Sequence, residues 1–236
     1  VHGDERQVLV TLQVGGRQKE LKAAKLLVAT GRKPNTEHLG LDLPGVDLDE
    51  HGFVKVNDEL RTSAEHVYAA GDVIGSYTGS QMATPVGAQD GGIAAENALS
   101  GKGSRKVNHA VIPRAIFTDP QVGVVGLSDE EANAQGYECD CRVIPMSLVP
   151  RAGAVRETRG VIKMVADRKT KKVLGVSVHG MNAAEVIHEA AMGLRFGAII
   201  DDFARMLHVY PTMSEALKIA ALSYTKDVSK MSCCAD

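Results

Sequence analysis

The sequence predicts a mixed fold in two parts, an α/β part up to about residue 107 and an α+β part from about Asn108 onward. In the first part, two apolar runs end in turns that carry Gly31 and Gly71, as the strands of an open α/β sheet do. In the second part, several strand-like runs are followed by helical patterns, which is the order typical of an α+β domain. The segment 100–104 (SGKGS) between the two parts has the composition of a linker.

The strands of the first part are expected where apolar runs meet glycine turns. Runs 8–14 and 20–28 are joined by Gly15-Gly16, which is a signal for a β-hairpin. Residues 26–32 (LLVATGR) are expected to form a buried strand that runs into a glycine turn. Residues 65–70 (EHVYAA) are expected to form a second buried strand, which ends at Gly71-Asp72.

Periodicity and helix-start signals predict the helices of both parts, and strand-like runs mark the strands of the second part. Thr84-Pro85 opens a helix to about Leu99, because proline is favoured at the first helical position. Ser128 opens a short helix with two early acidic residues. Further helices are expected over 183–196, over 201–206 and after Ser214. Strand-like runs occupy 111–117, 122–126, 141–148, 160–166 and 173–179.

Composition excludes several classes of function. The 236 residues carry a formal net charge of −2, and no stretch is as basic as a nucleic-acid-binding surface requires. No apolar run is long enough for a membrane span, and Val1 does not start a signal peptide. Four cysteines do not form a disulfide framework, so we expect a cytoplasmic protein. The absence of an initiator Met leads us to expect a fragment or a processed product.

Two close cysteine pairs are candidates for metal chemistry. Cys233 and Cys234 sit side by side near the end of the chain, where a mobile pair of thiolates suits the binding of one soft metal ion. The alternative for this pair is a fortuitous surface position. Cys139 and Cys141 are separated by one residue and share one face of a predicted strand. A metal role is conceivable for this second pair, but we expect two structural cysteines.

Gly71 and Asp72 form a candidate ligand-binding turn. A strand that ends in Gly-Asp places a carboxylate at the carboxyl edge of a sheet, where cofactors bind in open α/β folds. Gly71 allows close approach of the backbone to a ligand, and Asp72 can accept hydrogen bonds from sugar-like hydroxyls. A plain turn is the alternative interpretation.

Several motifs in register resemble a known family. The segments ATGRKPNT, RTSAEHVYAAGDV, ATPVGAQDGG, FTDPQVGVVGLS and VYPTMSEALK are similar, in this order, to the flavin-dependent pyridine nucleotide-disulfide oxidoreductases. The similarity covers essentially the whole chain. The ending KDVSKMSCCAD and the VPRA at Val149–Ala152 resemble the mercuric reductase branch of that family. This resemblance implies reduction of Hg(II) to elemental mercury with NADPH through FAD.

The resemblance also implies a domain organisation. The family's FAD phosphate loop, its redox-active cysteine pair and its NAD(P)H loop do not occur in the sequence, so we expect the carboxyl-terminal portion of a longer protein. Residues 1–33 are expected to be the tail of the NAD(P)-binding domain. Residues 34–107 are expected to be the carboxyl-terminal part of the Rossmann-like FAD-binding domain. Residues 108–236 are expected to be the interface domain, through which the family forms homodimers.

The same resemblance assigns cofactor-binding residues. Asp72 is expected to bind the ribitol hydroxyls of FAD, and Thr30 and Gly31 are expected to lie near FAD. The backbone at Ala83 and Thr84 is expected to begin a helix that points its amides at the flavin ring. The positive end of a helix stabilises negative charge that develops on a reduced flavin.

Tyr210 distinguishes the branches of the family. Disulfide reductases of the family carry a His-Pro-Thr segment that supplies a general acid, supported by a Glu five residues on. Here Tyr210 replaces the histidine, whereas Glu215 is kept. Tyrosine has an ordinary pKa near 10 and is a poor acid for a leaving thiolate, so Tyr210 favours metal-ion reduction.

In the metal-ion interpretation, Tyr210 helps to position the ion that Cys233 and Cys234 capture. Two alternatives stay open. One is an enzyme similar to dihydrolipoamide dehydrogenase or glutathione reductase. The other is a dimerisation and metal-capture module without turnover, which is what we expect of the isolated chain.

Overall fold

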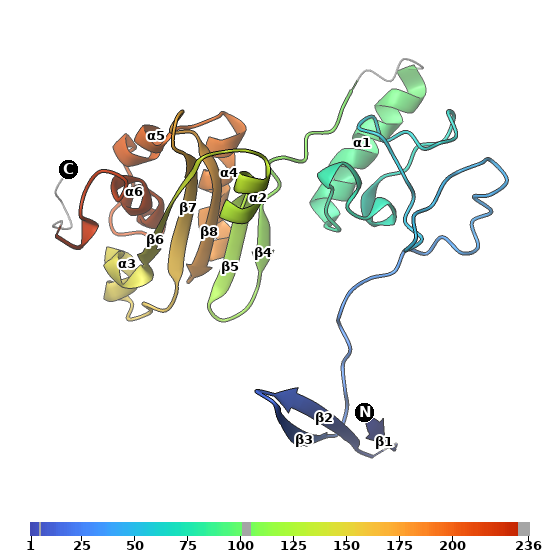
Figure 1. The fold of residues 1–236 in the computed structure, drawn as a ribbon, viewed down its shortest axis with the longest axis horizontal. Coiled ribbons are helices and arrows are strands. Elements are labelled where there is room, and N and C mark those ends of the chain that lie inside the picture. Colours follow the sequence, from blue (N-terminus) through green and yellow to red (C-terminus); the bar gives the residue numbers. More distant parts are fainter. Residues whose placement is uncertain (5, 101–104, 231–236) are drawn as a thin grey trace.

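The computed structural model describes residues 1–4, 6–100 and 105–230, so Cys233 and Cys234 lie outside the described residues. Figure 1 shows three successive parts: an amino-terminal hairpin, a middle part around one long helix, and a carboxyl-terminal sheet with its helices. The mixed fold predicted from the sequence is confirmed. Among the described residues, no helix is both long enough and apolar enough to cross a membrane.

The predicted hairpin is present. Strands β2 (Val8–Val14) and β3 (Arg17–Ala23) pair in antiparallel register, and the short β1 (His2–Gly3) pairs with β2. The two residues of the turn have φ values of +57° at Gly15 and +76° at Gly16. This left-handed backbone matches the twist of the flanking strands, which explains the two glycines.

Two strands expected in the first part are absent. Residues 24–34 contain no strand, and the side chains of Leu26, Leu27 and Val28 are exposed. Residues 65–70 form only an isolated bridge, from Tyr68 to Arg61. The predictions were wrong because apolar character alone does not make a strand. A strand also needs a neighbour for its N–H and C=O groups, and none of the described strands or bridges pairs with residues 24–30.

The middle part is built on helix α1 (Thr84–Ser100), which begins where the Thr84-Pro85 signal predicted. Two short 3₁₀ helices precede it, η1 (Gly71–Ile74) and η2 (Tyr77–Gly79). Asn97 of α1 is fully buried and donates hydrogen bonds to the carbonyls of Glu59 and Arg105 at 2.9 and 2.8 Å. Asn97 thereby fixes the backbone on both sides of the helix. The apolar contacts of this part form two small clusters around Leu60 and Val54.

In the carboxyl-terminal part, a strand forms within or overlapping each of the five predicted strand-like runs, and the five strands make one sheet. The strands are β4 (Arg114–Ile116), β5 (Gln121–Gly126), β6 (Cys139–Pro145), β7 (Val161–Asp167) and β8 (Val173–Gly180). Their order in the sheet is β4-β5-β8-β7-β6, and all neighbours are antiparallel. β4 and β6 are therefore the edge strands.

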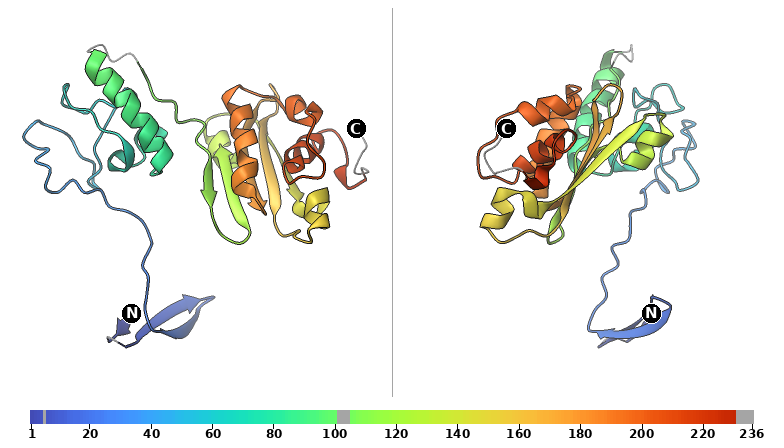
Figure 2. Two further views of the ribbon diagram at one scale, coloured as in Figure 1. Left: turned by 180° about the vertical axis from the view of Figure 1, so that it is seen from behind. Right: turned by 60° about the vertical axis from the view of Figure 1, so that its left-hand side comes forward.

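Helices cover the two faces of this sheet unequally (Figure 2). One face carries the large core and the helices α3 (Pro150–Ala154), α4 (Ala183–Arg195), α5 (Ile200–Arg205) and α6 (Glu215–Leu222), with the 3₁₀ turns η3 (Met146–Leu148) and η4 (Val228–Lys230) at its margin. The other face carries α2 (Asp129–Ala134), whose first turn is closed by a reciprocal capping box between Ser128 and Glu131. Helix α2 is short, so this second face is only partly covered.

Candidate functional site

An arginine joins the two glycine-bearing turns of the first part. Arg32 Nη1 donates to Asp72 Oδ2 at 2.5 Å and to the Met82 carbonyl at 3.0 Å. Asp72 lies in η1, and Met82 lies just before α1. The contact spans 40 residues of sequence and closes one side of a cavity. Its lining residues are Arg32, Lys33, Pro34, Asn35, Phe53, Asp72, Val73 and Met82, and its volume is about 380 Å³.

Gly71 sets the position of Asp72 against helix α1. Its φ of +81° lies in the left-handed region that side chains rarely adopt. A Cβ on Gly87 of α1 would lie 3.1 Å from the Gly71 Cα, so the two glycines allow η1 and α1 to approach closely. The carboxylate of Asp72 is thus held near the amino-terminal end of a 17-residue helix.

Ala83 and Thr84 lie at that helix end. The Ala83 N–H donates to the Gln81 carbonyl at 2.8 Å, and the Ala83 carbonyl accepts from the Gly87 N–H at 3.0 Å. Thr84 is the first residue of α1. Ala83 therefore forms the junction between the preceding turn and the helix, with its own N–H used inside the turn.

Thr30 and Gly31 are exposed and lead directly into Arg32. Gly31 has a φ of +142°, and a Cβ there would have no neighbour within 4 Å. The structure therefore connects this pair to Asp72 through Arg32. The sequence interpretation missed Arg32, although its place directly after Ala29-Thr30-Gly31 was a usable signal.

These residues fit part of an FAD site. They supply a carboxylate that can accept hydrogen bonds from hydroxyls, two glycines that let backbone segments approach closely, and the positive end of a long helix. The sequence contains no GxGxxG motif that would bind the phosphates. The residues present would hold one portion of the cofactor.

Tyr210 lies in a second, separate region, on the loop between α5 and α6. Its peptide bond to Pro211 is cis, and the residue is 51% exposed. Glu215 Oε2 accepts from the Thr212 N–H at 3.0 Å, so this carboxylate stabilises the loop that carries Tyr210. Among the described residues, the Thr212 hydroxyl is buried without a hydrogen-bond partner.

The same loop is tied to helix α4 by a histidine. His208 Nε2 lies 2.9 Å from Glu189 Oε1, and the His208 side chain is only 4% exposed. The hydrogen bond with Glu189 raises the pKa of His208 above its ordinary value. His208 thus positions the loop, a role that the sequence interpretation did not foresee.

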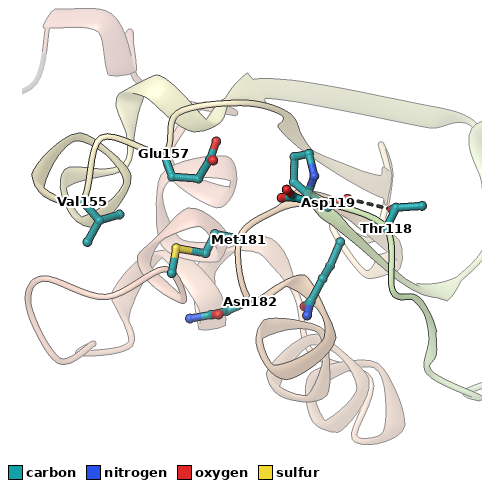
Figure 3. Close-up of a pocket in the computed structure, with 8 residues that line it drawn as sticks. Thr118, Asp119, Val155, Glu157, Met181 and Asn182 are labelled. Carbon is teal, nitrogen blue, oxygen red and sulfur yellow. Dashed lines mark hydrogen bonds between the residues drawn. The ribbon is translucent and has the colours of Figure 1, made fainter.

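A second cavity, of about 440 Å³, lies at the end of the carboxyl-terminal sheet (Figure 3). Two of its lining residues, Asp119 and Glu157, share one guanidinium: Arg159 Nη2 lies 3.1 Å from Asp119 Oδ1 and 2.5 Å from Glu157 Oε2. The hydrogen bonds from Arg159 lower the pKa of Glu157. Both carboxylates are therefore paired with Arg159. None of the residues expected from the sequence to bind a ligand lines this cavity.

Comparisons with known families agree with this architecture. Residues 1–92 match the family described as pyridine nucleotide-disulphide oxidoreductase, and residues 112–221 match the dimerisation domain of the same family. The fold and these two matches define an oxidoreductase architecture of the flavoprotein type. The chain belongs to the pyridine nucleotide-disulphide oxidoreductase family.

Individual members of the family are similar to this chain over nearly its whole length. A mercuric reductase from Lysinibacillus sphaericus is 44% identical over 99% of this chain and 41% of its own length. A mitochondrial dihydrolipoyl dehydrogenase from Pisum sativum is 37% identical over 96% of this chain and 44% of its own length. The solved structure of the HOCl-induced flavoprotein disulfide reductase RclA from Escherichia coli matches with a TM-score of 0.76 at 29% identity, over 95% of this chain and 49% of that one. The chain spans less than half the length of each of these relatives.

Proposed function

We propose that the chain is the carboxyl-terminal portion of a flavin-dependent enzyme that reduces mercury(II) to elemental mercury with NADPH. The observation that carries this proposal is Tyr210, at the position where disulfide reductases of the family have histidine. Identity supports it too, since the mercuric reductase from L. sphaericus is 44% identical and the dihydrolipoyl dehydrogenase is 37% identical.

In this proposal, FAD carries electrons from NADPH to the metal when it is bound. Asp72 would accept hydrogen bonds from the ribitol hydroxyls of FAD, and Thr30 and Gly31 would help to hold the cofactor. Arg32 orients the Asp72 carboxylate and neutralises part of its charge. The amino-terminal end of α1 at Ala83 and Thr84 carries positive potential, which would stabilise negative charge on a flavin bound there.

Cys233 and Cys234 capture the ion in this proposal. Hg(II) prefers two thiolates, so successive thiolate exchange moves it from solution thiols to the tail without release of a bare ion. The tail then passes the ion to a cysteine pair near the flavin in the partner subunit. The Tyr210 hydroxyl, half-exposed on a loop fixed by Glu215 and His208, contacts the ion during this transfer.

We propose that the protein forms homodimers through residues 108–236. The segment that matches the family's dimerisation domain presents large apolar side chains to solvent, on helix α4 and on the loops that flank α5. They are Met192, Phe196, Leu207 and Val209. A second copy of the chain would remove this apolar surface from water.

A disulfide oxidoreductase is the second candidate, favoured by the likeness to the dihydrolipoyl dehydrogenase and to RclA. The two functions differ in what the residue at position 210 must do. A disulfide reductase needs a proton donor for a departing thiolate near neutral pH, whereas metal reduction needs a ligand. A comparison of Hg(II) with a disulfide as the electron acceptor separates the two, and replacement of Tyr210 tests whether this residue takes part in metal reduction.

The experiment uses the full-length protein of which we propose this chain to be a part. Tyr210→Phe is expected to lower Hg(II)-dependent NADPH oxidation by about 10-fold or more, because about one hydrogen-bond-sized interaction with the reacting species is lost. Tyr137→Phe, which alters an exposed tyrosine after α2, is the matched control and is expected to retain the wild-type rate.

Equal rates for Tyr210→Phe and the wild type would remove Tyr210 from the mechanism. A wild-type enzyme that oxidises NADPH faster with a dithiol-derived disulfide than with Hg(II) would support the second candidate instead. The isolated 236-residue chain is expected to show no sustained NADPH oxidation, because its sequence lacks both phosphate loops and the redox-active cysteine pair.

A further inference from the structure

Cys139 and Cys141 lie on the same face of edge strand β6. Their partners on β7 are Asp167 and Val165, so the two cysteines occupy alternate positions of one regular ladder. Residues two apart on a strand point to the same side and are about 6.7 Å apart along it. Both thiols are free, and both side chains are half-buried.

The two thiols share one apolar wall. On the α2 side of the sheet they pack against a cluster of three buried residues, Ala132, Val165 and Leu174. Helix α2 is the one described helix on this face (Figure 2), and the half-buried side chains of Cys139 and Cys141 keep part of their surface in solvent. One side of each thiol is therefore buried against apolar residues of the sheet, and the other side is accessible to solvent.

Charged groups stand beside this pair. Asp129 of α2 forms an ion pair with Lys163 of β7, and the Asp129 carbonyl lies 3.8 Å from Cys139 Sγ. Burial raises the pKa of both thiols, and Asp129 adds to the effect. A lone thiolate is therefore disfavoured at either position.

The surroundings limit which ligand fits. A complex of two thiolates with a divalent ion has no net charge, so it suits a half-buried apolar wall better than a single thiolate does. Among residues 1–4, 6–100 and 105–230, no group of three or more His, Cys, Asp or Glu side chains is placed to share a metal ion. A four-coordinate ion such as Zn²⁺ therefore lacks ligands here, whereas a two-coordinate thiophilic ion needs only two.

We propose that Cys139 and Cys141 form a second binding site for a divalent, two-coordinate thiophilic metal ion, with Hg(II) as the probe. On binding, two S–H bonds break and two S–Hg bonds form. When the ion arrives as its bis-glutathione complex, the two protons end on the two released glutathione thiols. No electron is transferred, so the site binds the ion without reducing it.

This site is independent of the terminal pair and of the proposed catalytic function. It needs only the geometry of β6, which is present in the chain as it stands. A second site of this kind would hold an ion on the protein surface without involving Tyr210 or the tail.

The test removes the terminal pair first. The 236-residue chain with Cys233→Ser and Cys234→Ser is equilibrated with Hg(II) in excess glutathione, and retained metal is counted after desalting. We expect one ion per chain. Adding Cys139→Ser and Cys141→Ser is expected to abolish retention. Either single change is expected to weaken binding by roughly 100-fold, because the second thiolate then comes from free glutathione rather than from the chain.

Two further measurements keep the result interpretable. Far-UV circular dichroism and thermal unfolding report whether the serine variants fold, and Cys139→Ala with Cys141→Ala replaces them if they do not. X-ray absorption at the mercury edge is expected to show two sulfur ligands in the variant without the terminal pair. Retention of no ion by that variant, or of the same number by the variant that lacks all four cysteines, would overturn the proposal.

Discussion

The carboxylate of Asp90 and the imidazole of His109 lie 2.8 Å apart, and their side chains are only 2% and 5% exposed. Asp90 belongs to α1, whereas His109 lies beyond the 100–104 segment. The other ring nitrogen, Nδ1, faces the Thr78 hydroxyl at 3.1 Å and the Thr78 carbonyl at 3.2 Å. The Thr78 hydroxyl already donates to the Tyr77 carbonyl, so both Thr78 atoms accept from Nδ1–H. The pair therefore joins α1 to the segment after residue 104 and, through Thr78, to η2.

We expect this pair to be a main stabiliser of the middle part. Asp90→Ala leaves a buried histidine unpaired and is expected to lower the free energy of unfolding by about 3–5 kcal/mol. Asp90→Asn keeps the shape of the side chain and can donate to Nε2. The free energy of unfolding is therefore expected to fall by only about 1–2 kcal/mol. Urea unfolding of the two variants measures the difference. Equal losses would show that packing, and not the hydrogen bond, makes the contribution.

The close approach of Gly71 and Gly87 predicts opposite effects for two glycines of one helix. A Cβ at Gly91 would have no neighbour within 4 Å. Gly91→Ala is therefore expected to stabilise the protein by about 0.5–1 kcal/mol, because alanine has the higher helix propensity. A Cβ at Gly87 would lie 3.1 Å from the Gly71 Cα, so Gly87→Ala is expected to destabilise by about 1–3 kcal/mol. Thermal unfolding of both variants tests this. Stabilisation by Gly87→Ala would mean that η1 can move away from α1.

The His208–Glu189 contact predicts a pH dependence of stability. The pKa of His208 is raised in the folded state, so its stabilising contribution is complete below the ordinary pKa of 6.5. This contribution is lost as the pH rises through the raised pKa of His208. Unfolding measured between pH 5.5 and 8.5 should therefore show the wild type losing stability relative to Glu189→Gln, in which the carboxylate is gone. Parallel curves for the two proteins would contradict this role of the pair.

The hydroxyl of Tyr224 is expected to stabilise the packing of the segment after α6 against the sheet. Its hydroxyl lies 2.8 Å from the Met164 carbonyl and 3.0 Å from the Asp140 carbonyl, and the Arg142 guanidinium lies over its ring at 4.7 Å. Tyr224→Phe keeps the ring and removes the donor, so we expect a loss of about 1–2 kcal/mol in the free energy of unfolding. Burial raises the pKa of Tyr224, so the wild type is also expected to lose stability relative to the phenylalanine variant above about pH 10. An unchanged unfolding curve would assign the contribution to the ring alone.

Local patterns predicted the elements whose partners are close in sequence. The Gly15-Gly16 hairpin, the start of α1 and the alternation that places Cys139 and Cys141 on one face all follow from a few neighbouring residues. The strand expected over 26–32 failed because its formation depends on a neighbouring strand, which apolar character cannot supply.

The contacts that organise the candidate site could not be predicted in this way. Arg32 reaches Asp72 across 40 residues, and His109 reaches Asp90 across 19. Such pairs form only when the packing of the whole part brings the segments together, and no spacing in the sequence encodes them. Motifs that resemble a family located Asp72 and Tyr210, but the residues that position them became visible only in the structure.

The most direct test of the proposed function is the number of Hg(II) ions that the reduced chain retains in excess glutathione, compared with the Cys233→Ala/Cys234→Ala variant. Capture by the terminal pair predicts that the wild type retains one ion per chain more than the variant, whatever the pair at Cys139 and Cys141 binds. Equal retention by the two proteins would contradict a capture role for the tail, and the disulfide oxidoreductase would become the better account of this chain.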